Sequence, residues 1–366
     1  GITLTKRANG SAASVPLAGF PHHSLDQHLH KLLKAGHRVA ICEQVEDPKK
    51  AKGIVKREVV EVVSPGIAIT DQFLNQKENN YLMCLFGAEG SFGFALLDHS
   101  TGEFKTGERK LSKLSTIVQQ YSPSEILVPE FQLNDFQSRI GNEFLFTPYH
   151  EWMFDERSCY NRIKEHFKSQ NLKGFGLESL HLAIPCCGVV LDYLKKNCKA
   201  NINHISSVSI IKEKGFMNLD GFTIRNLEIF QPLNSQNNEN SLIHCLDNTR
   251  TAIGGRLLKS WMRSPLTNKS QIEFRHNVIE EIFNDKFFLD DIHRQFKKIA
   301  DVERIIARLT VNRANPREVQ QIGFSIQIWD EIKNSVSDLK SKSLKKLFKN
   351  YHDLNDVSNK ILNGLE

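Results

Sequence analysis

The sequence has few of the features that mark export, membrane insertion or a disulfide framework. Its seven cysteines are odd in number and scattered, with no C-x-x-C pair and no Cys/His spacing typical of a metal site. The longest apolar run, residues 180–193, is interrupted by Pro185 and Gly188 and is shorter than the roughly 18 residues of a membrane-spanning helix. The N-terminus also lacks the pattern of a signal peptide. We therefore expect a cytoplasmic protein with reduced, mostly buried cysteines, and the apolar surroundings of Cys186 and Cys187 favour a packed helix over a redox site.

Motifs of the common enzyme classes are missing as well. The sequence has no G-x-x-x-x-G-K-[ST], G-x-S-x-G, H-E-x-x-H or kinase signature, and TAIGGRLL lacks the lysine and spacing of a phosphate cradle. His28 and His30 fall on different faces of a predicted helix, which favours surface imidazoles over a metal site. Asp98 follows an apolar strand and resembles the first carboxylate of a nuclease, but no other acidic residue nearby lies at a comparable strand end. The sequence thus predicts no catalytic, cofactor or metal site.

The composition is typical of a globular protein of two or three domains. The chain has 366 residues, of which 40% are hydrophobic and 25% charged, and its mean hydropathy is −0.36. Lys and Arg outnumber Asp and Glu by 10 to 6 in residues 1–63 and by 27 to 21 in residues 191–366, whereas acidic residues prevail by 15 to 11 in residues 64–190. This basic, acidic, basic order is compatible with polyanion contact at both ends.

The first 66 residues predict a mixed α/β structure. After the strand-like run ITLT, Ser24 and Gln27 suit a capping box, and leucines at helical spacing indicate a helix over residues 25–35. Gly36 suits the end of that helix. The runs RVAICEQV and REVVEVV predict strands on either side of a charged turn, and a Ser-Pro-Gly turn ends the second strand.

From about residue 80 the pattern changes to a predicted meander. Apolar runs separated by Glu89-Gly90 and by Ser100-Thr101-Gly102 indicate antiparallel strands. LSKLSTIVQQY and FQLNDFQSRI have helical spacing on either side of EILVP, which reads as a buried strand. Because the strands pair locally and then alternate with helices, we expect an α/β sandwich.

Beyond about residue 200 the periodicity is almost entirely helical. ISSVSII and GFMNLD predict one strand pair. Apolar residues at i, i+3, i+4 and i+7 predict helices in TIRNLEIF, SLIHCLD, TAIGGRLLKSWM, QIEFRHNVIEEIF, DVERIIARL, PREVQQIGFSIQIWDEI and SLKKLFKNYHDLNDVSNKIL. Pro316 suits a first turn, and the last helix has no stop signal, so we expect it to continue beyond the chain. The predicted fold class is multidomain, α/β followed by an all-α bundle.

Binding is the function class that remains. Lys6 and Arg7 precede the small, flexible run ANGSAAS. The cations around a later turn and strand are Lys49, Lys50, Lys52, Lys56 and Arg57. Such residues suit contact with nucleic-acid phosphates, because neutralising phosphates releases counterions and small residues let backbone amides approach. A solvated basic loop explains the same composition, so the residues alone leave both interpretations open.

Several long motifs resemble the MutS family of bacterial DNA mismatch-repair proteins. P-x-A-G-x-P-x-H, R-V-A-I-C-E-Q and K-R-E-V-V are similar to its mismatch-recognition domain, and SFGFALLDHSTGEF to its RNase H-like connector. LDGFTIRNLEIF, TAIGGRLLKSWMRSPL and DVERIIARLTVNRANPRE resemble its helical core and lever. The resemblance covers essentially the whole chain and implies a partial mixed α/β recognition domain at 1–66, an RNase H-like connector at 67–198 and a core/lever bundle at 199–366.

The resemblance also implies a function and partners. It implies mismatch repair by binding duplex DNA with mismatches or small loops, in the nucleoid-associated cytoplasm, with MutL and a second copy of the protein as partners. The family's aromatic wedge lies in a Phe-x-Glu motif, which occurs here in no matching context, so we expect it ahead of residue 1. We likewise expect the clamp and the ATPase domain, with its ATP and Mg²⁺, outside this chain. The 366 residues are then a non-catalytic middle part, whose DNA binding should be weak, salt-sensitive and independent of mismatches.

Four residues are candidates for contact with the DNA backbone. Lys6, Arg7 and Arg57 match positions near the DNA in the family, and Ser11 adds a possible hydroxyl contact. The acidic connector would offer a packing and signalling surface, for which MutL is a plausible partner. Two alternatives stay open: a metal-dependent nuclease that uses Asp98, and an interaction scaffold whose basic ends are only solvated surface.

Overall fold

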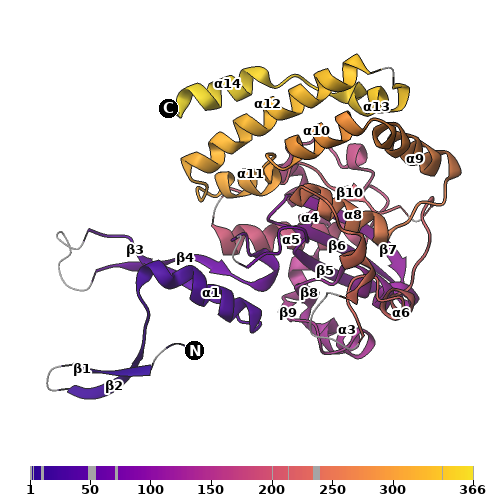
Figure 1. The fold of residues 1–366 in the computed structure, drawn as a ribbon. Coiled ribbons are helices and arrows are strands. Elements are labelled where there is room, and N and C mark those ends of the chain that lie inside the picture. Colours follow the sequence, from indigo (N-terminus) through magenta and orange to yellow (C-terminus); the bar gives the residue numbers. More distant parts are fainter. Residues whose placement is uncertain are drawn as a thin grey trace.

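The chain folds into three parts. The computed structural model describes residues 2, 4–9, 12–47, 55–70, 73–199, 201–212, 214–233, 240–339 and 341–365. We call the parts the arm (residues 4–63), the connector (residues 81–210) and the helical region (residues 221–364). The arm projects from the body, and the orange and yellow helices stack over one side of the connector (Figure 1). The predicted combination of mixed α/β structure with a helical bundle is confirmed.

The arm contains two separate hairpins joined by a helix. Its strands and helix are β1 Leu4–Asn9, β2 Ala12–Ala18, α1 Leu25–Lys34, β3 Val39–Gln44 and β4 Arg57–Val63. β1 pairs antiparallel with β2, and β3 pairs antiparallel with β4. Residues 8, 9 and 12–14 of the run ANGSAAS therefore lie in strands. Backbone pairing with the preceding strand supplies order that the small side chains do not.

The two ends of α1 test two local predictions. At the C-terminal end Gly36 has φ +79°, and the amides of Gly36 and His37 donate to the carbonyls of Leu33 and Leu32 over 2.9 and 3.0 Å. This is the left-handed ending that was predicted. At the N-terminal end Ser24 makes no side-chain cap, because it lies in a 3₁₀ turn with ψ 6° rather than in an extended conformation. The predicted capping box is therefore wrong.

The connector is a six-stranded mixed sheet covered on both faces. Its strands are β5 Tyr81–Ala88, β6 Ser91–Asp98, β7 Glu103–Lys110, β8 Glu125–Pro129 and β9 Phe146–Tyr149, and β10 Ser209–Ile210 adds a short edge strand. The sheet order is β10-β7-β6-β5-β8-β9, with β5, β6 and β7 antiparallel and β8 and β9 parallel. The predicted meander is confirmed, and three antiparallel strands beside two parallel ones match the RNase H-like prediction.

Helices fill both faces of this sheet. They are α2 Leu114–Tyr121, α3 Leu133–Ile140, α4 Glu156–Phe167 and α5 Ala183–Cys198. Residues of β5 alternate between two apolar cores, one shared with α4 and α5 and the other with α2 and α3. Five of the seven cysteines are buried, and Cys186 and Cys187 lie inside α5. Burial raises the pKa of Cys159 to about 12, so the buried thiols are unreactive rather than redox-active.

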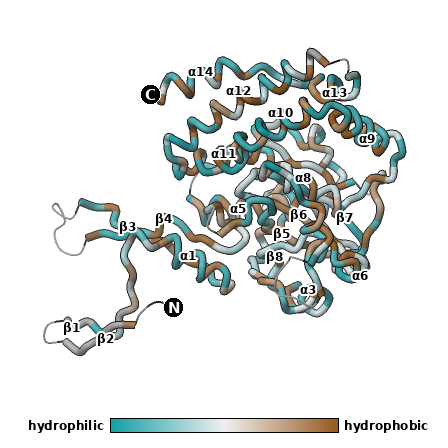
Figure 2. The backbone as a smooth tube through the Cα atoms, viewed as in Figure 1, coloured by the Kyte–Doolittle hydropathy of each residue, from teal (hydrophilic) through white to brown (hydrophobic). Residues whose placement is uncertain are grey.

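The helical region begins with short helices and ends with long ones. They are α6 Gly221–Asn226, α7 Leu242–Leu246, α8 Ala252–Arg263, α9 Lys269–Asn284, α10 Lys286–Phe296, α11 Val302–Thr310, α12 Pro316–Asp338, α13 Lys342–Leu347 and α14 Asn355–Gly364. Hydrophilic and hydrophobic residues alternate along the longer helices (Figure 2). Pro316 occupies the first turn of α12, as predicted, behind a capping box of Asn315 and Glu318. Within the described residues, each helix is too short or too polar to cross a lipid bilayer.

Two predictions for this region are wrong. ISSVSII and GFMNLD do not pair with each other: β10 joins β7 in parallel, and Phe216 forms only an isolated bridge with Leu266. The predicted last helix is interrupted between α13 and α14. At the interruption the hydroxyl of Tyr351 donates to Asp330 on α12 over 3.1 Å, and the ammonium of Lys333 lies 4.7 Å from the Tyr351 ring centre. The local spacing of apolar residues favours a continuous helix here, but the contacts of Tyr351 with α12 favour an interruption.

A buried polar network fixes the end of the arm on the connector. Both carboxylate oxygens of Glu125 on β8 accept hydrogen bonds, one from the hydroxyls of Thr147 (2.7 Å) and Tyr193 (2.6 Å) and the other from the Ser64 hydroxyl and the Gly66 amide. Glu125 and Ser64 are fully buried. A Cβ atom on Gly66 would lie 2.8 Å from the Cβ of Glu125, so only glycine fits this approach. The Ser-Pro-Gly turn thus anchors the arm as well as ending a strand.

A buried histidine and a half-buried one beside this anchor predict acid sensitivity. The rings of His99 and His204 lie 5.2 Å apart, and His99 Nδ1 is 3.0 Å from the carbonyl oxygen of Ile67. Burial, and then the charge of His204 and Arg313, lowers the pKa of His99 to about 4, so His99 is neutral in the folded protein at pH 5 to 7. The unfolded chain binds a proton in this range near its usual pKa of about 6.5, so stability falls as pH falls.

Because of His99, we expect the free energy of unfolding to be about 2 kcal/mol lower at pH 5 than at pH 7. His99→Asn keeps a donor for Ile67 but cannot titrate, so urea denaturation at the two pH values should differ by that much less. His276→Asn, at an exposed position on α9, is the control and should retain the wild-type difference. An unchanged difference in His99→Asn would contradict this role for His99.

Candidate nucleic-acid interface

The two hairpins of the arm present the candidate DNA-contacting residues. Lys6 lies in β1 opposite Pro16, and its side chain is exposed. The backbone of Arg7 continues the same strand opposite Val15, while Ser11 lies outside the described residues. An exposed cation on a projecting hairpin can reach a phosphate without displacing other parts of the protein.

Arg57 lies on the other hairpin. It begins β4, pairs with Gln44 on β3 and is exposed. Next to it, Lys56 forms an exposed ion pair with Glu58 over 2.7 Å, which raises the pKa of Lys56 and keeps it charged. The structure thus places Lys6 and Arg57 in two different sheets of the same arm, and β3–β4 carries its own opposing acidic group.

Sequence reasoning missed other cations of the arm. Lys31 and Lys34 lie exposed in the last turn of α1, and Arg38 lies exposed just before β3. The guanidinium of Arg38 is 5.6 Å from the centre of the Tyr193 ring, which places it at the junction with the connector. Helical periodicity could have shown that Lys31 and Lys34 share a face, since they are three residues apart.

The chain has one Phe-x-Glu sequence in the connector, and it cannot serve as a wedge where it lies. Phe154 precedes Asp155 and Glu156, and its side chain is only 4% exposed. Its ring stacks on Phe86 at 5.4 Å between ring centres, within the connector core. Insertion between bases would require Phe154 to leave that core, so this motif has a packing role.

The carboxylate of Asp98 organises a turn. One oxygen accepts from the amide and hydroxyl of Ser100 over 2.9 and 2.7 Å, and the other accepts from Asn79 and from the amide of Asn80. The sequence argument that no acidic residue lies nearby at a strand end is wrong, because Glu103 pairs directly with Asp98 across β6 and β7. Glu103 in turn accepts from Tyr81 and pairs with Lys105. Protein donors therefore occupy both carboxylates, and the described residues contain no cluster of three or more metal-ligating groups.

The glycine-rich stretch at the start of α8 does not fit a nucleotide phosphate. The Thr251 hydroxyl accepts from the Gly254 amide over 3.0 Å and caps the helix. A Cβ atom on Gly255 would lie 2.7 Å from the side chain of Lys77, so this surface of the helix is already covered. The Gly254 amide thus donates to the Thr251 hydroxyl and the Gly255 amide to the Thr251 carbonyl over 3.1 Å, so both serve the protein itself rather than an anion.

Comparisons with known proteins agree with this arrangement. Sequence models of three domains of one family match successive parts of the chain: MutS domain I matches residues 1–72, MutS domain II residues 80–206 and MutS domain III residues 222–364. The chain belongs to the MutS family. Its relatives include proteins named DNA mismatch repair protein MutS from Bacteroides fragilis (41% identical over 95% of this chain), Flavobacterium psychrophilum (39% over 99%) and Cytophaga hutchinsonii (38% over 100%).

The extent of these matches relates the structure to the family. The arm lies in MutS domain I, most of the connector in MutS domain II and most of the helical region in MutS domain III. The chain spans about two fifths of these relatives, 40% of the Bacteroides protein and 42% of the other two. The assignment of Lys6, Arg7, Ser11 and Arg57 as DNA contacts, and the domain boundaries at residues 66 and 198, stay predictions.

Proposed function

We propose that this chain binds duplex DNA through its arm as part of a MutS protein that acts in DNA mismatch repair. The observation that carries the proposal is the coincidence of MutS domain I with a projecting arm that exposes Lys6 and Arg57. The two residues neutralise phosphates and position the duplex, and they read no bases. Lys6 and Arg57 have a binding role and no catalytic one. We propose that other parts of the whole protein bind ATP and Mg²⁺.

Arg57→Ala should weaken binding to matched and mismatched duplexes equally. Because Arg57 is proposed to contact a phosphate, its loss should reduce the slope of log affinity against log salt by about 1. Fluorescence anisotropy with a short duplex, with and without a G·T mismatch, measures both quantities across a salt series. We expect weak binding by the wild-type chain with no preference for the mismatch.

The control for this titration is Lys269→Ala, which removes an exposed cation from α9 in the helical region. This variant should bind both duplexes like the wild type. Equal affinity of Arg57→Ala and wild type would contradict the assignment of Arg57, and no binding by the wild type at low salt would contradict DNA binding by this chain. A clear preference of the wild type for G·T would show that mismatch reading resides within the arm.

We further infer that the connector offers a docking surface for MutL and that the whole protein self-associates in the cytoplasm. Two large aromatic side chains of the connector are exposed, Phe131 by 59% and Trp152 by 69%, in the acidic part of the sequence. Sedimentation of the chain alone and with purified MutL reports the mass of each complex. If the chain sediments as a monomer in both measurements, residues 1–366 contain neither the MutL-binding surface nor the self-association surface.

A further inference from the structure

The segment that joins the arm to the connector is held by the helical region. The Arg256 guanidinium on α8 donates to the carbonyl of Gln76 over 2.8 Å, and Arg304 on α11 donates to the carbonyls of Asn75 (3.0 Å) and Glu78 (2.6 Å). Both arginines are almost fully buried, at 4% and 1% exposure. These contacts join residues about 180 to 230 positions apart in the sequence and fix the backbone of the joining segment.

Two neighbouring side chains of opposite charge determine which residues of the segment face which residues of the helical region. The Lys77 ammonium donates to the Asp247 carboxylate and to the Thr249 carbonyl, each over 3.0 Å. The next residue, Glu78, accepts from the Lys259 ammonium on α8 over 2.5 Å. A shift of the segment by one residue would place either Lys77 beside Lys259 or Glu78 beside Asp247, according to its direction, and either like-charge contact is unfavourable.

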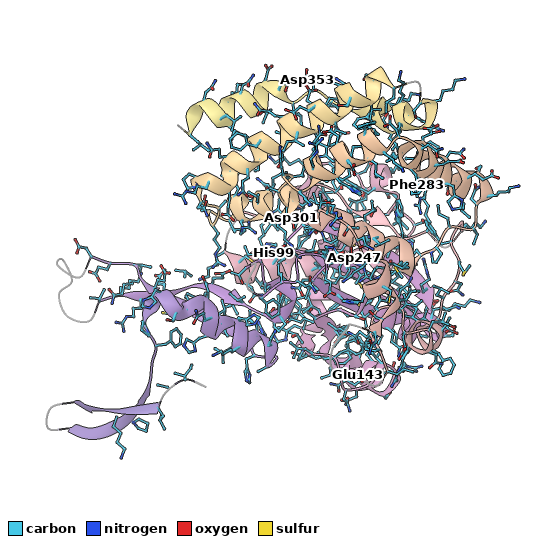
Figure 3. The ribbon with its side chains drawn as sticks, in the orientation of Figure 1. His99, Glu143, Asp247, Phe283, Asp301 and Asp353 are labelled. Carbon is cyan, nitrogen blue, oxygen red and sulfur yellow. The ribbon has the colours of Figure 1, made fainter. Side chains whose placement is uncertain are left out.

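Three basic side chains on one face of α8 contact this segment and the connector beside it. Arg256, Lys259 and Arg263 are three and four residues apart and therefore share a face. Arg263 extends the contact to the connector, where its guanidinium lies 5.8 Å from the ring centres of both Tyr81 and Tyr121. In Figure 3 Asp247 and Asp301 lie where the helical region meets the connector, and Asp301 in turn holds Arg256 through two contacts of 2.7 Å.

Gly255 permits the close approach. A Cβ atom at this position would lie 2.7 to 2.8 Å from three carbon atoms of the Lys77 side chain. An alanine in a helix is ordinarily more favourable than a glycine, so the glycine is explained by the passage of Lys77 across the helix. The substitution Gly255→Ala would disturb the contact without altering any charge.

We propose that Lys77 and Glu78 form a two-charge key that sets the register of the arm-to-connector segment on the helical region. The matching socket consists of Asp247 and Lys259. The key positions the arm and thereby its grip on DNA, and this last step rests on the proposed function. Lys77, Glu78, Asp247 and Lys259 are positioning residues, because they touch neither DNA nor a substrate.

Reversal of the charges tests the proposal in the 366-residue chain. Lys77→Glu combined with Glu78→Lys keeps the net charge but opposes like charges in the socket. We expect amide hydrogen exchange in residues 73–80 to become about tenfold faster and duplex affinity to fall roughly twofold to thirtyfold. Adding Asp247→Lys and Lys259→Glu restores complementarity and should return both quantities toward the wild type. Gly255→Ala should accelerate exchange in the same residues.

The matched control reverses an exposed ion pair that lies outside the key. Lys269→Glu with Glu273→Lys on α9 should leave exchange in residues 73–80 unchanged. The key would be overturned if amide exchange in residues 73–80 were unchanged in the charge-reversed double variant, or if it did not recover in the variant with all four substitutions. Faster exchange with unaltered duplex affinity would overturn its link to DNA. If exchange follows the prediction but even the wild type binds no duplex at low salt, the key stands and the proposed function fails.

Discussion

Glu125→Ala is expected to lower the free energy of unfolding by about 3 kcal/mol or more. The carboxylate accepts from four donors around it, and alanine leaves those donors buried without an acceptor. An unsatisfied buried donor costs about 1 to 3 kcal/mol, and reorientation of the hydroxyls recovers part of the total. Urea denaturation measures the loss, and hydrogen exchange should locate it at residues 64–67 and in β8 and β9.

A nearby carboxylate provides the comparison. Glu130 follows β8 directly, but its side chain is 55% exposed and pairs with the exposed ring of His150. Glu130→Ala should therefore change stability by less than about 0.5 kcal/mol. A loss in Glu125→Ala as small as that of Glu130→Ala would mean that water can replace the network, and the arm would then have no fixed anchor.

The correct sequence predictions rest on local backbone requirements. Gly36 ends α1 because it adopts a positive φ at little cost, and Pro316 starts α12 because its position needs no amide hydrogen. Glu89 and Gly90 turn the chain between β5 and β6 with φ +50° and +76°. Each signal involves a few consecutive residues, so the sequence contains all the information that decides it.

The wrong predictions concern partners that are distant in the sequence. Ser209 and Ile210 have a strand-like pattern, but the pattern does not show that their partner is the edge of β7. Tyr351 has helical spacing with its neighbours, yet its contacts with α12 interrupt the helix. Apolar spacing predicts that a segment has a buried face and cannot specify what covers it.

The candidate site divides in the same way. The family resemblance, added to the cation clusters, predicted Lys6 and Arg57 as contact residues, and both are exposed on the arm. No local pattern singled out Glu125, Lys77 or Glu78, because their partners lie between 22 and 181 positions away. The exposed cations of the arm could therefore be named from the sequence, whereas the residues that hold the arm in place could not.

Gly93→Ala should disrupt the connector. On β6 the backbone of Gly93 supports the start of α5, and a Cβ atom there would lie 2.1 Å from both the carbonyl carbon and oxygen of Leu182. The obstruction is backbone rather than a flexible side chain. The Glu108 carboxylate, opposite Gly93 on β7, also accepts from the amides of Leu182 and Ala183 and ties this turn to the sheet. We expect a loss of about 3 kcal/mol or more, because α5 must move away from the core that it shares with α4 and β5.

Thermal and urea unfolding of Gly93→Ala measure that loss, and Gly87→Ala in the neighbouring strand β5 is the matched control. A Cβ atom on Gly87 would lie 3.4 Å from Phe136, an ordinary contact, so this variant should stay within about 1 kcal/mol of the wild type. The damage in Gly93→Ala should include faster exchange in residues 64–67, because Tyr193 of α5 donates to Glu125 in the anchor of the arm. Wild-type stability in Gly93→Ala would mean that α5 can shift freely, and the anchor could not then hold the arm in one position.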